Sequence, residues 1–351
     1  MTALVSGACQ AGGGTGREPG SMRNSAIAAA GLRKAYRDKV VLDGIDLDVE
    51  TGTVFSLLGP NGAGKTTTVN VLTTLIKAAG GTARVAGHDV ATETKAVRAA
   101  IGVTGQFAAV DELLTGQENL QLMADLKRLS SGEANRVITD LLARFDLTES
   151  ARKLASTYSG GMRRKLDLAM TLVDRPEIIF LDEPTTGLDP RSRRTMWDII
   201  RQLVADGVTI FLTTQYLEEA DRLADRIAVL DQGQLVAQGT PVELKRQLPG
   251  SHVRLRFASD PELGAALRLL TGASREDEDD LVVRVPSDGG AASVRALLNE
   301  LDAHSIDVEE FSVHTPDLDD VFLALTGHPS TDLASPDLAN TDLANTGENA
   351  R

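Results

Sequence analysis

The segment Gly59–Thr67, with the sequence GPNGAGKTT, constrains the fold of this chain more strongly than any other stretch. It follows an apolar run at 54–58 that is typical of a buried strand, and it leads into helix-like sequence at 69–72. A buried strand, a glycine-rich turn and a helix N-terminus are the context that a phosphate-binding loop requires. The sequence therefore predicts an α/β fold with a phosphate-binding loop (P-loop) at its centre.

Each residue type in this loop has a physical role in holding phosphate. Glycines allow backbone conformations that are closed to larger residues, so that N–H groups can surround phosphate oxygens. The helix N-terminus adds unpaired N–H donors and the positive end of its dipole. Lys65 can place a positive charge on the β and γ phosphates, and the Thr66 hydroxyl can bind Mg²⁺. We expect the whole loop to contact the nucleotide: Gly59, Pro60, Asn61, Gly62, Ala63, Gly64, Lys65, Thr66 and Thr67.

A second apolar run, Ile178–Leu181, ends in two adjacent acidic residues, Asp182 and Glu183. The run is typical of a parallel strand buried on both faces. Asp182 is suited to bind Mg²⁺, directly or through water, and Glu183 to polarise an attacking water. Paired acids at a strand end can also cap a helix. After a phosphate loop we favour the catalytic interpretation.

Three weaker signals complete the candidate site. Ser159-Gly160-Gly161 precedes an amphipathic helix and forms a second anion-binding terminus, which one nucleotide does not need unless it serves another copy of the chain. Tyr36 could stack on an adenine base, or it could be an ordinary edge-strand tyrosine. Gln106 closes a strand and could offer its amide oxygen to a metal or a water near the γ-phosphate, or it is merely exposed.

In their order along the chain, these motifs resemble those of the ATP-binding subunits of ABC transporters. The resemblance covers roughly residues 26–240 and identifies Gln106 with the Q-loop. The other matching motifs are the Walker A loop at Gly59–Thr66, the signature at Ser159–Gly161, the Walker B strand with catalytic glutamate at Leu181–Glu183 and the D-loop at Gly187–Asp189.

The resemblance implies a head-to-tail dimer with two ATP molecules between its subunits. Ser159 and Gly161 of one copy would contact the γ-phosphate that Lys65 of the other copy holds. Gln106 would help Thr66 and Asp182 to organise Mg²⁺. Because the chain has one Walker A motif, a transporter needs a second copy or a paralogue, and a separate transmembrane permease. We expect the chain at the cytoplasmic face of the cell membrane, attached through that permease.

Two positions depart from the family pattern. The usual signature begins with Leu and ends with Gln, whereas this chain has Tyr158 and Met162. The family's switch histidine is replaced by Gln215, which we expect to sense the γ-phosphate through a hydrogen bond without titrating. The sequence after Gln215 and the stretch 316–327 resemble the daunorubicin-resistance branch of drug-export ATPases. This narrower resemblance implies that ATP hydrolysis powers the export of a drug-like or antibiotic molecule.

Composition bears on the alternatives. Asp and Glu number 50 against 36 Lys and Arg, a net charge of −14, which disfavours a nucleic-acid partner. A soluble ABC-type ATPase without a transport role, and a nucleotide-gated regulator with little turnover, stay open as alternatives. Repair forms of the first class would show zinc-binding cysteines or a long coiled coil, whereas this chain has the single cysteine Cys9.

Changes in sequence character divide the chain into four parts. We expect a disordered leader at 1–25 and an ATP-binding domain at 26–248 with a helical subdomain at about 107–160. A small α+β domain is expected at 251–327, and a disordered repeat tail at 328–351. No apolar run approaches the ~18–20 residues that a membrane-spanning helix needs.

Overall fold

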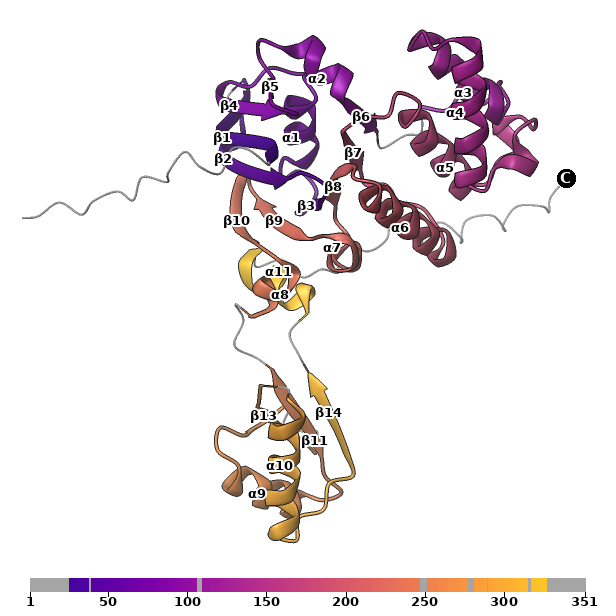
Figure 1. The fold of residues 1–351 in the computed structure, drawn as a ribbon. Coiled ribbons are helices and arrows are strands. Elements are labelled where there is room, and N and C mark those ends of the chain that lie inside the picture. The colour runs from indigo at the N-terminus through magenta and orange to yellow at the C-terminus, as the bar shows by residue number, and fades with distance from the viewer. Residues whose placement is uncertain are drawn as a thin grey trace, which may run out of the picture.

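The computed structural model describes seven stretches of the chain, at 25–37, 39–105, 109–246, 251–276, 281–288, 290–314 and 317–326. The predicted repeat tail, the leader up to residue 24 and Gln106 lie outside the described residues. Helices surround a central sheet, and a smaller α+β unit follows it (Figure 1). This arrangement confirms the predicted fold class.

A six-stranded sheet in the order β10-β9-β3-β8-β7-β6 forms the centre of the ATP-binding part. Its strands are parallel except β10, which pairs antiparallel with β9. Strands β3, β7 and β8 are buried at every position, as expected for strands covered on both faces. Because these strands are parallel, the loops after them meet at one edge of the sheet. The six strands are β3 (Val54–Leu58), β6 (Ile101–Thr104), β7 (Ile178–Asp182), β8 (Thr209–Thr214), β9 (Arg226–Asp231) and β10 (Gln234–Gly239).

An antiparallel sheet in the order β2-β1-β4-β5 packs beside the central one. Helix α1 (Lys65–Leu72) shares a hydrophobic core with this sheet and with Phe55, Phe180 and Phe211 of the central strands. The rings of Phe55 and Phe211 stack with their centroids 5.5 Å apart. This core fixes the start of α1, and therefore the phosphate loop, against two sheets at once. The remaining elements are β1 (Ser25–Tyr36), β2 (Lys39–Glu50), β4 (Gly80–Val85), β5 (His88–Asp89) and α2 (Thr94–Ala100).

Between β6 and β7 the chain forms a helical unit, which stands to one side of the central sheet (Figure 1). Thr115 and Glu118 form a reciprocal capping box at the start of its first helix. The unit shares one core with helix α6 (Pro190–Ala205), through residues such as Leu120, Phe145 and Leu166. Its elements are α3 (Gly116–Leu126), α4 (Ser131–Arg144), the short turns η1 (Thr148–Ser150) and η2 (Ala155–Thr157), and α5 (Gly160–Thr171).

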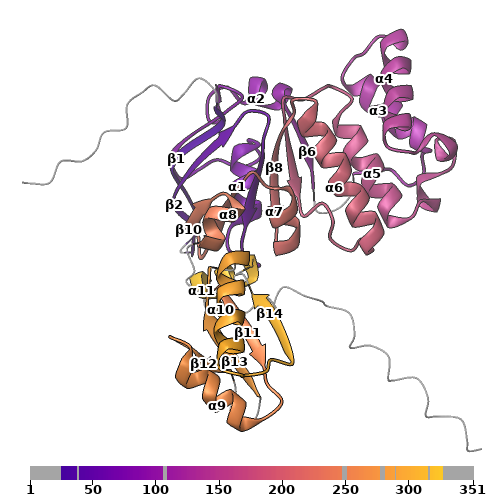
Figure 2. The same cartoon turned by 60° about the horizontal axis from the view of Figure 1, so that its bottom comes forward.

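After α7 (Leu217–Leu223) and α8 (Pro241–Arg246), the chain forms a small domain with its own core. An antiparallel sheet in the order β12-β13-β11-β14 carries two helices, and the domain projects from the ATP-binding part (Figures 1 and 2). Its elements are β11 (His252–Arg256), α9 (Asp260–Leu269), β12 (Ser274–Arg275), β13 (Val282–Pro286), α10 (Ala291–Ala303) and β14 (Glu310–His314).

The last described helix, α11 (Leu318–Thr326), packs differently from the prediction. We assigned it to the small domain at 251–327, but its buried residues Leu318, Val321 and Phe322 join a core formed with α7, α8 and β9. The chain therefore leaves the ATP-binding part after α8 and returns to it with α11. None of the helices within the described stretches has the length and hydropathy that crossing a bilayer requires.

Candidate functional site

The predicted phosphate loop lies between β3 and α1, at the carboxyl edge of the central sheet. A Cβ at Gly59 would lie 2.2 Å from the carbonyl oxygen of Leu230, so only glycine fits there. Gly64 has a φ of +114°, a conformation that L side chains rarely adopt. Since Gly64 is also the N-cap of α1, no side chain occupies the first N–H groups of that helix. The loop thus has the geometry that an anion requires.

The side chain of Lys65 turns back over its own loop. Its Nζ donates to the carbonyl oxygens of Gly59, at 2.7 Å, and Pro60, at 3.1 Å. Burial lowers the pKa of the Lys65 ammonium, while the carboxylates of Glu183 and Asp182 raise it. Phosphate oxygens would offer this ammonium charged partners, which form stronger hydrogen bonds than neutral carbonyls.

Three oxygen-bearing side chains meet beside Lys65. The Thr66 hydroxyl donates to Asp182 Oδ2 at 3.3 Å, and the Thr213 hydroxyl donates to Asp182 Oδ1. Hydroxyl and carboxylate oxygens are ligands that suit Mg²⁺, so this donor set fits the predicted ion. The structure therefore brings together Thr66 and Asp182, two of the three residues predicted to bind metal. The third, Gln106, lies outside the described residues.

Glu183 has a positive φ of 48°, which is uncommon for a residue other than glycine and typical of functional sites. Its N–H donates to the carbonyl of Thr213 at 3.0 Å, and its Oε2 accepts from the Thr186 hydroxyl at 3.3 Å. Glu183 as a whole residue is 7% exposed. Backbone and side-chain bonds therefore fix Glu183 next to Asp182, at the edge where the phosphate loop lies.

Gln215 follows β8 at the same edge of the sheet and is half-buried. Four residues later, Glu219 is fully buried, and it accepts hydrogen bonds from Thr185, at 2.8 Å, and Trp197, at 3.1 Å. Burial raises the pKa of the Glu219 carboxyl. Glu219 thus ties the segment after Gln215 to the segment after Glu183. We did not predict this role; α7 also carries Glu218 and Asp221, so its sequence does not single out Glu219.

Tyr36 is 47% exposed at the end of β1, and Lys34 Nζ lies 5.1 Å from the centre of its ring. The β1–β2 hairpin contacts the phosphate loop, because a Cβ at Gly64 would lie 2.7 Å from Leu42. The Tyr36 ring is therefore accessible, near the tip of a hairpin that touches the phosphate loop.

Ser159-Gly160-Gly161 begins α5, and the Ser159 side chain caps the helix by accepting from the N–H of Met162 at 3.2 Å. In both views of the fold, the central strands lie between α1 and α5 (Figures 1 and 2). The structure therefore brings the loop, Asp182 and Glu183 together, but it does not bring the signature to the phosphate loop of the same chain.

The structure explains the departure at Tyr158. This side chain is buried, and its hydroxyl donates to the carbonyl of Ser150 at 2.7 Å. A Cβ at Gly116 would lie 2.2 Å from the same hydroxyl. Tyr158 and Gly116 are therefore a matched pair: because Gly116 has no side chain, there is room for the Tyr158 ring.

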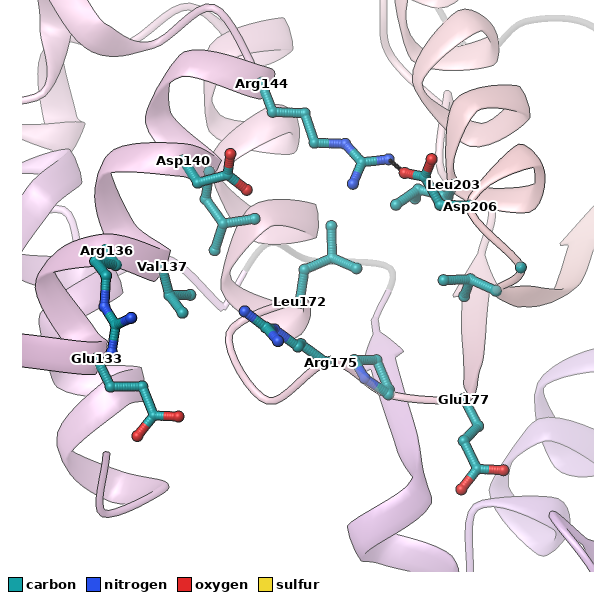
Figure 3. A pocket seen from close by; sticks show the side chains of 14 residues that line it. Glu133, Arg136, Val137, Asp140, Arg144, Leu172, Arg175, Glu177, Leu203 and Asp206 are labelled. Atoms are coloured by element: carbon teal, nitrogen blue, oxygen red, sulfur yellow. Dashed lines mark hydrogen bonds and ion pairs between the residues drawn. The ribbon is translucent and has the colours of Figure 1, made fainter. Parts of the chain in front are cut away.

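A cavity of about 730 Å³ lies away from this site, between α4, the turn before β7 and the turn before β8 (Figure 3). Arg144 and Asp206 form an ion pair at one side of it. The cavity adjoins the amino-terminal ends of β7 and β8, whereas the candidate site follows their carboxyl ends. No residue that we predicted for the site lines it.

Known proteins resemble this chain in both of its parts. Residues 42–186 match the ABC transporter family, and residues 239–326 match the C-terminal domain of DrrA1-3-like ATP-binding proteins. The chain is 49% identical to the daunorubicin/doxorubicin resistance ATP-binding protein DrrA of Streptomyces peucetius, over 88% of this chain and 94% of that protein. It is 48% identical to the daunorubicin resistance ATP-binding protein DrrA3 of Streptomyces coeruleorubidus, over 87% and 97%. A solved structure of an ATP-binding subunit of an ABC transporter is 28% identical, with a TM-score of 0.58 over 64% of this chain and 93% of that one.

Proposed function

The chain belongs to the ATP-binding subunits of ABC transporters, and from this premise we propose that its ATP hydrolysis powers the export of a drug-like or antibiotic molecule through a separate membrane permease. The observation that carries the proposal is the contact of Thr66 with Asp182 beside Lys65 and Glu183. It joins a phosphate loop, a pair of oxygen ligands and a carboxylate at one edge of the sheet.

Lys65 and the loop N–H groups hold the β and γ phosphates of ATP. Thr66 and Asp182, with Gln106, are the residues that would hold Mg²⁺, which neutralises charge on the phosphate oxygens when it is bound. Tyr36 stacks on the adenine ring. These contacts fix the γ-phosphate. Phosphoryl transfer needs mainly this positioning, together with stabilisation of the charge on the phosphate oxygens.

Glu183 accepts a hydrogen bond from the attacking water and aligns it with the γ-phosphorus. As charge shifts in the transition state, the Lys65 ammonium and the loop N–H groups stabilise it on the phosphate oxygens. Gln215 donates its amide N–H to the γ-phosphate. Because an amide does not titrate near neutral pH, Gln215 positions this group without moving a proton.

A second copy completes each site. The N-terminus of α5 presents Ser159-Gly160-Gly161 as an anion-binding terminus, and within one subunit it lies across the central strands from the loop. A head-to-tail dimer brings this terminus to the γ-phosphate of the partner. ATP then bridges the subunits, and hydrolysis releases them, a population shift caused by contacts that exist only in the closed state.

The names of the relatives support the nature of the cargo. Both are named as daunorubicin resistance ATP-binding proteins. The similarity to each of them covers nearly nine-tenths of the present chain. The similarity includes the small C-terminal domain. A non-transport ATPase or a nucleotide-gated regulator is not favoured by these relatives. Attachment to the permease places the chain at the cytoplasmic face of the membrane.

Transport in inside-out vesicles tests the proposal. The vesicles carry this chain together with its permease, and ATP-dependent uptake of daunorubicin is measured by fluorescence. We expect uptake with the wild type and loss of uptake with Lys65→Ala. Lys127→Ala, which breaks an exposed ion pair with Asp174, is the matched control and should transport normally. Hydrolysis that requires Lys65 but drives no uptake would favour the alternatives.

A further inference from the structure

The signature helix contains a buried ion pair that the steps above do not use. Arg164 and Asp167 lie on α5 with 8% and 2% of their surface exposed. Arg164 Nη1 lies 3.4 Å from Asp167 Oδ2. Burying two charges costs free energy unless further hydrogen bonds satisfy both groups. The partners of this pair therefore indicate its role.

Arg164 holds the backbone that carries the two site carboxylates. Its Nη2 donates to the carbonyl oxygens of Asp182, at 3.0 Å, and Glu183, at 3.3 Å. Its Nε donates to the carbonyl of Pro184 at 2.9 Å. One guanidinium thus contacts three consecutive peptide groups, and the middle one belongs to the residue that has positive φ.

The pair also holds both flanks of the segment 106–108. Arg164 Nη1 donates to the carbonyl of Gly105 at 2.7 Å. Asp167 Oδ1 accepts from the N–H of Ala109 at 2.9 Å. The two side chains therefore connect α5 to three pieces of backbone: the end of β7, the residue after β6 and the residue that begins the next described stretch.

Arginine suits this position because of its shape. A guanidinium has five N–H donors in a rigid plane, whereas a lysine ammonium is a point charge on a flexible stem. Lysine could keep the charge beside Asp167, but it could not reach the carbonyls on both sides at once. The requirement is therefore for the geometry of the group as well as its charge.

We propose that Arg164 and Asp167 are positioning residues that couple the signature end of α5 to the backbone of Glu183. The inference rests on the proposed dimer, in which Ser159-Gly160-Gly161 contacts the partner's ATP. Arg164 follows Gly161 by less than one helical turn, so a shift of α5 reaches the guanidinium directly. Seating the signature on the partner's nucleotide then sets the position of Glu183 in its own subunit, and the two ATP sites are linked.

Arg164→Lys tests the proposal in the full-length chain. Four quantities are measured: the Kd for a fluorescent ATP analogue, the kcat for ATP hydrolysis, the apparent cooperativity of hydrolysis with respect to ATP and the thermal midpoint. We expect Kd to stay within about threefold of wild type, because the phosphate loop is unchanged. We expect kcat to fall roughly 10- to 100-fold at temperatures well below the midpoint, the range that a small misplacement of reacting groups produces. The apparent cooperativity of hydrolysis with respect to ATP should fall as well.

Arg144→Lys is the matched control, because Arg144 also links the helical unit to the core, through an exposed ion pair with Asp206. It should leave all four quantities at wild-type values. Asp167→Asn keeps the volume and the acceptor for Ala109 but removes the charge that holds Arg164. It should reproduce the fall in kcat with little change in Kd, and it decides the question by the same criteria if Arg164→Lys does not fold.

Two results would overturn the proposal. One is a kcat within threefold of wild type; the other is a fall in both kcat and ATP affinity that follows the loss of folded protein. Lys65→Ala, measured in parallel, separates this failure from failure of the proposed function. Hydrolysis that requires Lys65 but not Arg164 would reject the coupling alone. Hydrolysis that does not require Lys65 would reject the proposed ATP site itself.

Discussion

At the scale of single residues, backbone groups help to hold both Lys65 and Glu183 in place. Lys65 donates to two carbonyls of its own loop, and Glu183 is fixed by the carbonyl of Thr213. The backbone bond of Glu183 persists when its own side chain is replaced. Substitutions at the site should therefore affect chemistry more than folding, which makes their kinetic effects interpretable.

Gln215 offers the sharpest test at this scale. Gln215→Ala should lower turnover much more than ATP affinity, because its contact matters most in the closed, reacting state. Gln215→His should retain substantial activity and add a pH dependence between about 6 and 7, where an imidazole titrates. Steady-state ATPase assays and nucleotide binding for both variants check these expectations.

Gln202→Ala is a suitable control, since Gln202 is an exposed residue of α6 whose side chain bonds Asp206. It should match the wild type. If Gln215→Ala also matches the wild type in turnover and affinity, Gln215 has no switch role, and hydrolysis rests on Glu183 and the phosphate contacts.

The packing of α3 against Tyr158, which lies just before α5, yields a prediction about elements. Gly116→Ala should destabilise the wild type, because the new Cβ would lie 2.2 Å from the Tyr158 hydroxyl. In a Tyr158→Leu background the same change should be tolerated, because the ring is gone. Thermal midpoints of the four proteins in this cycle measure the coupling. Additive effects would show that the two residues do not form a matched pair.

Glu219 yields a prediction about α7 and pH. Because burial raises the pKa of this carboxyl above its ordinary value of 4.5, the unfolded chain loses this proton at lower pH than the folded protein does. Glu219 therefore favours folding while it is protonated, and the benefit is lost as pH rises from about 4.5 through the higher pKa of the folded state. Glu219→Gln should remove this dependence.

The measurement is the unfolding midpoint of both proteins as a function of pH, followed by tryptophan fluorescence. Trp197 is the only tryptophan of the chain and donates directly to Glu219, so its emission reports this region. The stability of the wild type relative to Glu219→Gln should fall as pH rises above 4.5. A difference that does not change with pH would mean that Glu219 has an ordinary pKa.

Local motifs could be predicted from the sequence because their residues are adjacent in the chain. The phosphate loop needs only a strand, glycines and a helix start within about twenty residues, and each was visible. Partners distant in sequence could not be found in this way. Arg164 reads as one more basic residue of a helix, yet it contacts backbone 18 to 20 residues later and 59 residues earlier.

The helix α11 illustrates the same limit for a whole element. Its apolar spacing predicts a buried face, but an apolar face does not specify which surface covers it. The structure places that face on α7 and α8, so the two ends of the small domain are both tied to the ATP-binding part. Gln106 stays a prediction, because it lies outside the described residues.

At the scale of the whole molecule, the proposed mechanism depends on ATP joining two copies of this chain. The subunit carries a phosphate loop on one side of its central strands and an anion-binding signature on the other. In the dimer that we propose, the loop of one copy gains the signature contact from the other copy. In a closed dimer, the phosphate loop of each copy would face the signature of the other, which gives two sites.

Glu183→Gln tests this claim most directly. The substitution keeps the shape of the side chain and its bond from Thr186 but removes the charge that aligns water, so ATP should bind and hydrolysis should nearly stop. Size-exclusion chromatography at saturating ATP and Mg²⁺ should then show a stable dimer, which the additional change Lys65→Ala abolishes. A Glu183→Gln protein that binds ATP and remains a monomer would contradict the proposed ATP-bridged dimer.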